Sequence, residues 1–147
     1  MINRLNIRVY GLLLNEEQEI LVVDEQINDF KFTKFPGGGL ELGEGIADCL
    51  QREFMEECEL AIQVDKHFYT TDFFQVSAFR PTDQLISIYY WVSPQNKPFH
   101  INLNTITLNL DGKIEILQFK WIKLADLDEN IFTFPIDKLV CSMLKKM

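Results

Sequence analysis

Three consecutive glycines, followed by a stretch with helical periodicity, constrain the folding of this chain more than any other feature. The glycines are Gly37, Gly38 and Gly39, and the helical pattern covers residues 46–58. Glycine adopts positive φ at little steric cost and allows a ligand to approach the main chain closely. We therefore expect a tight loop whose amides and carbonyls approach a ligand, leading into a helix over 46–58.

The helical segment distributes its charges unusually. At about 100° per residue, one apolar stripe forms from Ile46, Ala47, Cys49, Leu50, Phe54 and Cys58. An ordinary surface helix places its acids opposite such a stripe. Residues three and four apart share a helix face, so Glu53, Glu56 and Glu57 instead form one carboxylate cluster beside the stripe, while Arg52 falls opposite it.

This carboxylate cluster requires a cation. Three like charges beside a core are costly unless positive charge neutralises them. Arg52 contributes one such charge, four residues before Glu56, which is not enough. An all-oxygen cluster suits a hard ion such as Mg²⁺ or Mn²⁺, so the pattern predicts a divalent metal site on this helix face.

The spacing of these residues resembles the Nudix box of the Nudix (MutT-like) hydrolases, which is GX5EX7REUXEEXGU with U apolar. The match covers positions 38–60. The matching fixed positions are Gly38, Glu44, Arg52, Glu53, Phe54, Glu56, Glu57 and Leu60. The one departure is Glu59, where the family pattern has glycine.

The resemblance implies hydrolysis of a nucleoside diphosphate linked to another group, with water attacking a phosphorus of the pyrophosphate. It implies Mg²⁺ or Mn²⁺ held by Glu53, Glu56 and Glu57, with Glu53 also a candidate general base. Arg52 is expected to orient these carboxylates through a charge-assisted hydrogen bond. A backbone carbonyl of the glycine loop, nearest to Gly38, is expected to add a metal ligand.

The same resemblance assigns the remaining site residues. Gly37–Gly39 are expected to lie against the substrate, with Glu44 as a structural partner beside them, and Glu41 resembles an acid common in the family's loop. Some family members take the base or a metal ligand from a later loop. Glu115, which precedes the strand carrying Trp121, is the catalytic candidate there, and its alternative interpretation is an ordinary acid at a strand edge.

Glu59 affects the end of the helix. Helices commonly end at a glycine in the left-handed conformation. A glutamate held in that conformation costs on the order of 1 kcal/mol, so we expect either that cost or a different helix end. The substitution is expected to affect the cap rather than the chemistry.

The other periodicities predict strands around one internal and one terminal helix. Strands are expected over 5–14, 19–23, 30–35, 67–71, 73–76, 85–92, 99–110 and 115–124, with a loop over 24–29, a tight turn at Asp111-Gly112 and a helix over 135–146. This order predicts the α+β class. It is also the order of a Nudix-type α/β/α sandwich, with a mixed central sheet, a catalytic helix after a Gly-rich loop and a C-terminal helix, in one domain over 1–147.

The composition narrows the class of partner. A net charge of −8 without a basic run argues against nucleic acid, but a bound metal would still allow a phosphorylated small molecule. Three cysteines without metal-type spacing predict reduced thiols and a cytoplasmic protein, with Cys49 and Cys58 in the core. Neither a signal peptide nor a transmembrane segment is expected.

Three functions agree with the sequence. The first is a metal-dependent pyrophosphohydrolase, the second a non-catalytic Nudix-fold module that binds a nucleotide or nucleotide sugar, and the third a structural metal-binding protein. The three retained acids favour the enzyme. The substrate stays open among nucleoside triphosphates, ADP-ribose and nucleotide sugars, because the proline or tyrosine that marks two subfamilies beyond the box is missing near Gln75-Val76. A homodimer is possible.

Overall fold

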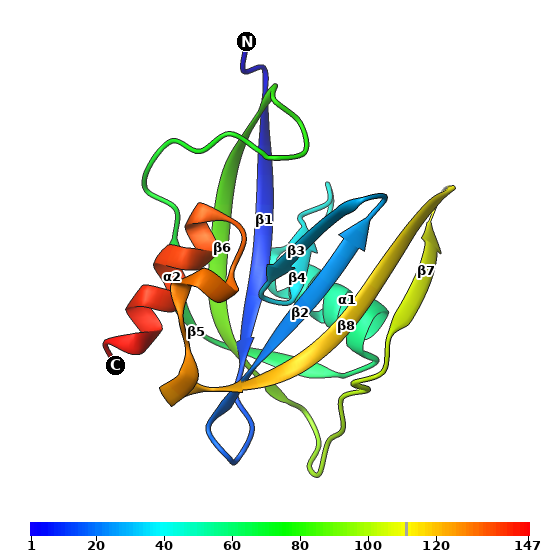
Figure 1. The fold of residues 1–147 in the computed structure, drawn as a ribbon, viewed down its shortest axis with the longest axis vertical. Helices are drawn as coiled ribbons and strands as arrows, with labels where there is room; N and C mark the ends of the chain where they lie inside the picture. The colour runs from blue at the N-terminus through cyan, green and yellow to red at the C-terminus, as the bar shows by residue number, and fades with distance from the viewer. Residues whose placement is uncertain (111) are drawn as a thin grey trace. The chain divides into compact units, whose positions relative to one another are not determined.

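The strands of this protein form two four-stranded sheets (Figure 1) in a computed structural model that describes residues 1–110 and 112–147. One sheet has the strand order β4-β1-β6-β5, formed by β1 (Arg4–Leu13), β4 (Gly37–Gly39), β5 (Ile62–Thr70) and β6 (Asp83–Pro94). The other has the order β3-β2-β8-β7, formed by β2 (Glu19–Ile27), β3 (Phe30–Lys34), β7 (Ile106–Leu110) and β8 (Lys113–Lys123). The helices are α1 (Ile46–Cys58) and α2 (Pro135–Lys145), with short 3₁₀ turns at Leu124–Asp126 and Glu129–Ile131.

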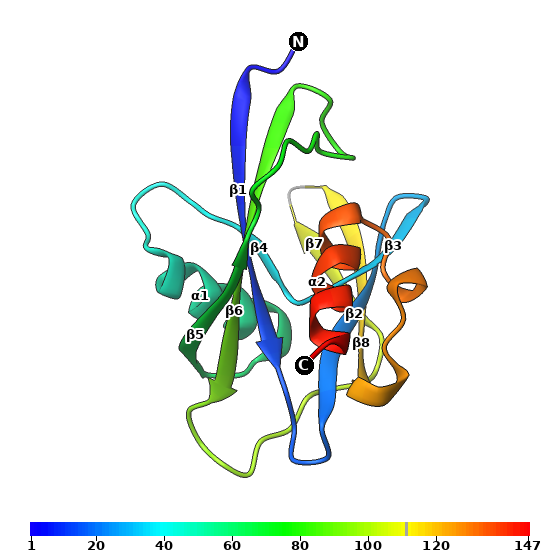
Figure 2. The ribbon, with the colours of Figure 1, turned by 90° about the vertical axis from the view of Figure 1, so that its left-hand side faces the viewer.

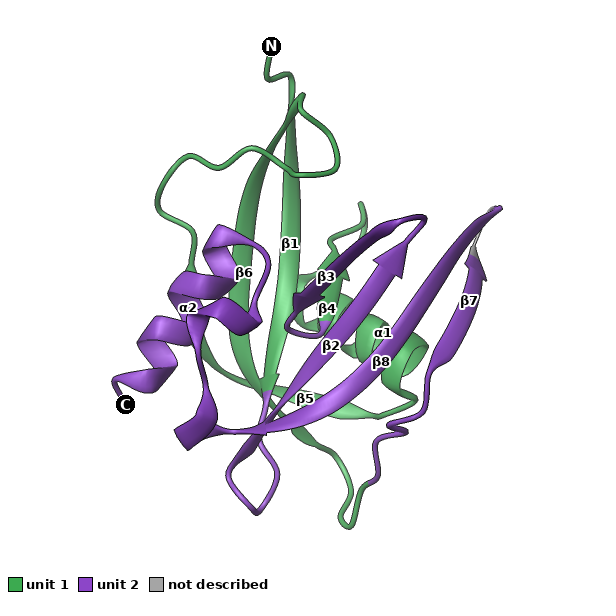
Figure 3. Cartoon of the chain, in the orientation of Figure 1, with its two compact units in different colours: residues 1–12, 37–99 green, residues 13–36, 100–147 purple. Residues whose placement is uncertain are grey.

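The chain divides into two compact units (Figure 3). Unit 1 consists of Met1–Leu12 and Gly37–Phe99, and unit 2 of Leu13–Pro36 and His100–Met147. Unit 1 therefore contains the sheet with β1 and β4 together with α1. Unit 2 contains the other sheet and α2.

In unit 1, α1 packs closely on its sheet. The helix contacts β4 and β5 (Figure 2) and buries Cys49, Leu50, Phe54 and Cys58, as the apolar stripe predicted. Gly11 of β1 makes this approach possible, because a Cβ there would lie 2.6 Å from the Cε1 atom of Phe54. The helix bounds predicted from periodicity are confirmed.

In unit 2, β2 has antiparallel partners on both sides, β3 and β8. It continues to Ile27, so the loop predicted over 24–29 is wrong for its first four residues. The polar residues there have partners on the neighbouring strands. The Asp24 carboxylate lies 3.1 Å from Lys120 Nζ, and the buried Glu25 carboxylate lies 3.2 Å from the buried Lys34 Nζ.

Other predictions have mixed outcomes. The α+β class is confirmed, with strands divided between two sheets rather than gathered in a single central one. Of the stretch 73–76, only Val76 makes an isolated bridge, to Gln84. Of the stretch 99–110, Ile106–Leu110 forms a strand. The turn predicted at Asp111-Gly112 includes Asp111, which lies outside the described residues.

Helix α1 ends at Glu59 in the left-handed conformation, with φ 52° and ψ 37°. The Glu59 amide donates to the Met55 carbonyl at 3.2 Å, and the Leu60 amide donates to the Phe54 carbonyl at 3.4 Å. Glutamate therefore occupies the geometry that the family pattern assigns to glycine.

We expect Glu59→Gly to stabilise the protein by about 1 kcal/mol, because it removes the steric cost of a side chain at positive φ. Urea denaturation would measure the difference. Glu59→Ala is the matched control and is expected to give no gain, because it keeps the Cβ while removing the carboxylate. Equal stabilisation by both substitutions would mean that the charge, and not the backbone, is responsible.

The three cysteines are all buried and free. Burial raises the pKa of the Cys49 thiol to about 12 and that of the Cys141 thiol to about 11. The core positions predicted for Cys49 and Cys58 are confirmed. Among the described residues, neither helix combines the length and the apolarity that crossing a bilayer requires.

Candidate active site on helix α1

A six-residue connection returns the chain from β4 to the start of α1, and it is held by its own hydrogen bonds. The Leu40 amide donates to the Ile7 carbonyl at 2.9 Å, which continues the pairing of β4 with β1. The Glu41 amide donates to the Glu44 carboxylate at 2.9 Å. At the helix start, the Gly45 amide donates to the Asp48 carboxylate at 3.0 Å. The connection therefore holds Glu44 beside the first turns of α1.

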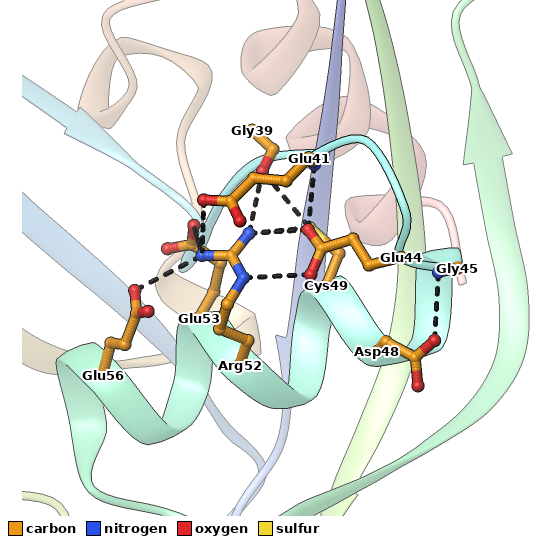
Figure 4. A network of polar contacts seen from close by, with 9 residues as sticks. All are labelled: Gly39, Glu41, Glu44, Gly45, Asp48, Cys49, Arg52, Glu53 and Glu56. Carbon is orange, nitrogen blue, oxygen red and sulfur yellow. Dashed lines mark hydrogen bonds and ion pairs between the residues drawn. The ribbon is translucent and has the colours of Figure 1, made fainter.

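Arg52 is the centre of the polar network (Figure 4). Its Nε and Nη2 atoms donate to the two oxygens of Glu44 at 3.0 and 2.7 Å, a bidentate pair. Nη2 also donates to the Gly39 carbonyl at 3.0 Å. Nη1 donates to Glu53 at 2.9 Å and to Glu56 at 3.4 Å. Arg52 thus joins the glycine strand, the connection and two acids of its own helix.

Arg52 has partners that the sequence did not indicate. The helical period placed it opposite the apolar stripe, and the resemblance implied a hydrogen bond to the carboxylates, but the side chain is also largely covered, with only 24% of it exposed. The connection folds back over this face and supplies Glu44 and the Gly39 carbonyl as partners. These contacts come from residues eight and thirteen positions earlier, so a helical projection could not reveal them.

The Arg52–Glu44 pair lowers the pKa of the Glu44 carboxyl from 4.5 to about 2, chiefly through the hydrogen bonds from Arg52. The same pair and the nearby acids raise the pKa of Arg52. Charge-assisted, bidentate contacts of this kind are the strong ones. Glu44 is therefore ionised across the physiological range, and Arg52 is fixed by it.

A pH dependence follows from Glu44. Because its pKa is lower in the folded protein than in the unfolded chain, its contribution to stability is complete above pH 4.5 and is lost as the pH falls toward about 2. We expect Glu44→Gln to be less stable than the natural protein at neutral pH, and the difference to shrink over that acidic range. Urea denaturation at a series of pH values would measure it.

Glu41→Gln is the control for this prediction, because the Glu41 carboxylate is 69% exposed and 3.8 Å from Arg52. Exposed pairs contribute little, so this variant should follow the natural protein at every pH. A Glu44→Gln difference that stays constant down to the lowest pH would contradict the ionic origin of the effect.

Glu53 packs directly on the glycine strand. The site of a Cβ on Gly38 lies 2.7 Å from Glu53 Oε2, so the missing side chain of Gly38 is the space that the carboxylate occupies. Only 12% of the Glu53 side chain is exposed. Glycine at position 38 therefore leaves room for the Glu53 carboxylate. Packing, and not backbone conformation, is the reason that this position requires glycine.

The other two acids of the predicted cluster lie further along the same face. Glu56 is 58% exposed, and Glu57 has a buried carboxylate oxygen, Oε2. Exposure therefore differs within the cluster, from 12% of the Glu53 side chain to 58% of the Glu56 side chain.

The charge around Arg52 favours an added cation. One guanidinium lies within 4.0 Å of four carboxylates, those of Glu41, Glu44, Glu53 and Glu56, so this group carries a net charge of −3 (+1 − 4). Among the described residues, three or more His, Cys, Asp or Glu side chains are nowhere grouped at metal-binding spacing. Glu53 and Glu56 instead accept hydrogen bonds from Arg52. By charge and by oxygen donor type, the acids fit a hard divalent cation.

The glycine run is a strand and not the loop that was predicted. Gly37, Gly38 and Gly39 pair with Tyr10, Val9 and Arg8 of β1 in antiparallel register. Of the three, only Gly37 has a positive φ, of 148°, and a Cβ there would collide with the Val9 carbonyl. The run therefore contains one glycine required by conformation and one, Gly38, required by Glu53.

Glu115, the later acid predicted from the sequence, lies on β8 in unit 2, in register with Leu108 of β7 and Ile27 of β2. Its catalytic role stays a prediction. Sequence reasoning also missed a contact of Cys49, whose Sγ lies 3.5 Å from the Gly39 carbonyl and 3.8 Å from Arg52 Nη2. Its position on the apolar stripe indicated only core packing.

Comparison with known proteins identifies related folds. The model of one family, the NUDIX domain, matches residues 4–141. No curated protein matches the chain. Among solved structures, the MutT protein from Methanosarcina mazei Go1 superposes with a TM-score of 0.72 at 17% identity, covering 99% of this chain and 96% of that one.

Two further solved structures carry different activities in their names. A UDP-X diphosphatase has a TM-score of 0.61 at 14% identity, covering 96% of this chain and 63% of its own. An ADP-ribose pyrophosphatase from Streptococcus suis 89-1591 has a TM-score of 0.56 at 16% identity, covering 97% of this chain and 92% of its own. Identities this low show a shared fold alone.

Proposed function

This chain belongs to the Nudix family, and we propose that it is a metal-dependent hydrolase of the pyrophosphate bond in a nucleoside diphosphate linked to another group. The observation that carries the proposal is the network around Arg52. It holds a largely buried Glu53 side chain against Gly38 and leaves an excess of negative charge beside the glycine strand. The match of one family model to residues of both units supports a single Nudix domain over 1–147.

Glu53, Glu56 and Glu57 would hold Mg²⁺ or Mn²⁺. Such ions lower the pKa of a bound water and neutralise charge on phosphoryl oxygens. The three side chains offer only oxygen donors, as these hard ions prefer. The sequence also suggested a backbone carbonyl at or near Gly38 as a ligand. The strand pairing favours one of the three glycine carbonyls.

Hydrogen-bonded and non-hydrogen-bonded pairs alternate along an antiparallel ladder. Leu40 pairs with Ile7 through a hydrogen bond, so the Gly38–Val9 pair two residues on is hydrogen-bonded as well, which directs the Gly38 carbonyl toward β1. The carbonyls of Gly37 and Gly39 then face away from β1, and that of Gly39 accepts from Arg52. We therefore propose the Gly37 carbonyl as the main-chain ligand.

The chain's own residues supply the proton transfer and the positioning. Glu53 is the proposed general base, because its carboxylate is nearly buried and its position is fixed by Arg52 and Gly38. Arg52 orients Glu53, and Glu44 in turn fixes Arg52. Glu115 is the second candidate for the base. Gly37–Gly39 would border the substrate phosphates.

The substrate class is a small nucleotide derivative. The structural relatives include a UDP-X diphosphatase and an ADP-ribose pyrophosphatase, which supports a pyrophosphate-containing substrate without choosing among triphosphates, ADP-ribose and nucleotide sugars. The net charge of −8 favours such a molecule over nucleic acid. Buried free thiols agree with a cytoplasmic location, and a homodimer is a further expectation.

Phosphate release from a substrate panel would test the proposal. The panel contains nucleoside triphosphates, ADP-ribose, nucleotide sugars and dinucleoside polyphosphates, each with Mg²⁺ or Mn²⁺ and with a chelator. We expect metal-dependent turnover of one class and a loss of about 100-fold or more in Glu57→Gln, because a carboxylate proposed to hold the catalytic metal is removed. Glu16→Gln, at an exposed acid, is the matched control and should retain activity.

Two outcomes would contradict the enzyme. Absence of turnover across the panel, with thermal protection by one of the nucleotides, would indicate a binding module that does not hydrolyse its ligand. Thermal protection by the metal alone, with neither turnover nor nucleotide binding, would indicate a structural metal site.

A further inference from the structure

Two charged side chains of opposite sign flank the glycine strand on opposite faces. Successive residues of a strand project to opposite sides, and on β4 Gly38 faces Glu53 while Gly39 faces Arg8. Arg8 lies on β1 in register with Gly39, and its Nη1 atom is 3.4 Å from the site of a Cβ on that glycine. Absence of side chains from β4 thus leaves both Glu53 and Arg8 in contact with its backbone.

Arg8 is held in place by an aromatic pair. Its Nε atom donates to the Tyr10 hydroxyl at 3.2 Å, and its Cζ atom lies 5.9 Å from the centre of the Tyr10 ring. Tyr10 is buried and stacks on the buried Tyr89 at a centroid distance of 5.1 Å. The half-buried guanidinium is therefore anchored by a rigid support, which reduces the entropy lost when it binds an anion.

We propose that Arg8 binds the phosphate of the substrate's diphosphate that is not engaged at the acidic cluster. This inference rests on the proposed function. In its sheet, β4 is an edge strand, so a ligand lying across its edge can reach both faces. One phosphate then lies on the side of Glu53 and the other on the side of Arg8. The planar fork of a guanidinium matches the oxygens of a phosphate.

The charge distribution explains why a second cation is needed. Arg52 is surrounded by four carboxylates, which lie within 4.0 Å of it. A diphosphate brought to that cluster meets negative charge on the α1 side of β4. Arg8 supplies positive charge on the other side, so it should distinguish a diphosphate from a single phosphate.

Calorimetric binding of inorganic pyrophosphate and inorganic phosphate, with Mg²⁺ present, tests this assignment without a nucleobase and without turnover. We expect Arg8→Ala to weaken pyrophosphate binding by about 10- to 100-fold, the range for a lost charged hydrogen bond. Phosphate binding should change by less than about threefold. Arg8→Lys keeps the charge without the fork and should fall between the natural protein and Arg8→Ala.

Arg80→Ala, at an exposed arginine of the same unit, is the matched control and should leave both ligands unaffected. Equal weakening of pyrophosphate by Arg8→Ala and Arg80→Ala would overturn the proposal, as would equal weakening of the two ligands by Arg8→Ala. If Arg8→Ala does not fold, Arg8→Lys decides: pyrophosphate affinity equal to that of the natural protein would overturn the role of the guanidinium fork.

The two proposals fail separately. Absence of turnover in the panel, with pyrophosphate binding that depends on Arg8, would contradict the hydrolase and support the phosphate site. Turnover together with pyrophosphate binding that is unchanged in Arg8→Ala would support the hydrolase and contradict the phosphate site. With an active enzyme, Arg8→Ala should raise KM and leave kcat nearly unchanged, because the contact is made equally in the ground and transition states.

Discussion

Replacing Gly38 with alanine is expected to lower turnover by about 100-fold while leaving the fold intact. The new Cβ would lie 2.5 Å from the Glu53 carboxyl carbon, so the proposed general base has to move. The carboxylate is the far end of a flexible side chain, and its displacement costs the fold little. A misplacement of about 1 Å in a reacting group, however, costs on the order of 100-fold in rate. Steady-state kinetics and thermal unfolding would measure the two effects.

The neighbouring Gly39→Ala variant is the control for this experiment. Its Cβ would meet only the end of the flexible Arg8 side chain, at 3.4 Å, and Glu53 would keep its place. We expect kcat close to that of the natural protein, with any loss of activity confined to KM, because the new Cβ lies beside the proposed phosphate-binding Arg8 and not beside the base. Normal kcat in Gly38→Ala would show that the base does not depend on this packing, and would favour Glu115 in that role.

Replacing Gly37 with alanine is expected to act on stability instead, lowering the free energy of unfolding by about 3 kcal/mol or more. Gly37 has a φ of 148°, a region that side chains avoid. Its Cβ would also collide with the Val9 carbonyl and lie 2.7 Å from the Tyr10 Cα. These are main-chain atoms of the paired strand, and they cannot relieve the clash by a change of rotamer as a side chain can.

Urea denaturation of Gly37→Ala, Gly38→Ala and Gly39→Ala in parallel would separate the three roles. Gly37→Ala should be the least stable of the set, and Gly39→Ala should lie within about 1 kcal/mol of the natural protein. Similar losses in all three would mean that glycine is needed only for chain flexibility. The pattern predicted here requires a different reason at each of these positions.

Local periodicity was sufficient for the parts of this fold whose contacts are local. Helix α1 has the predicted bounds, because its apolar residues recur at helical spacing and its first turn closes on Gly45 and Asp48. The left-handed end at Glu59 was one of two expected outcomes, and the structure retains it. The acids of the box could be identified because their spacing alone places them on one helix face.

The errors arise where partners are distant in sequence. The segment from Asp24 to Ile27 reads as a polar loop, but its charges pair with Lys120 and Lys34 on adjacent strands. The sequence did not indicate the contacts of Arg52 with Glu44 and with the Gly39 carbonyl, because neither group belongs to its helix. The contact of Arg8 with Gly39 depends on strand register, which no motif in the chain encodes.

The three buried cysteines allow local opening of each unit to be measured without adding a label. Cys49 and Cys58 belong to unit 1 and Cys141 to unit 2, and all three are shielded from reagents in solution. A thiol reacts as the thiolate, and burial raises the pKa of Cys49 to about 12. Alkylation of any of these residues therefore requires its surroundings to open first. The rates of modification, resolved by mass spectrometry, would give the opening of each unit separately in the unmodified natural sequence.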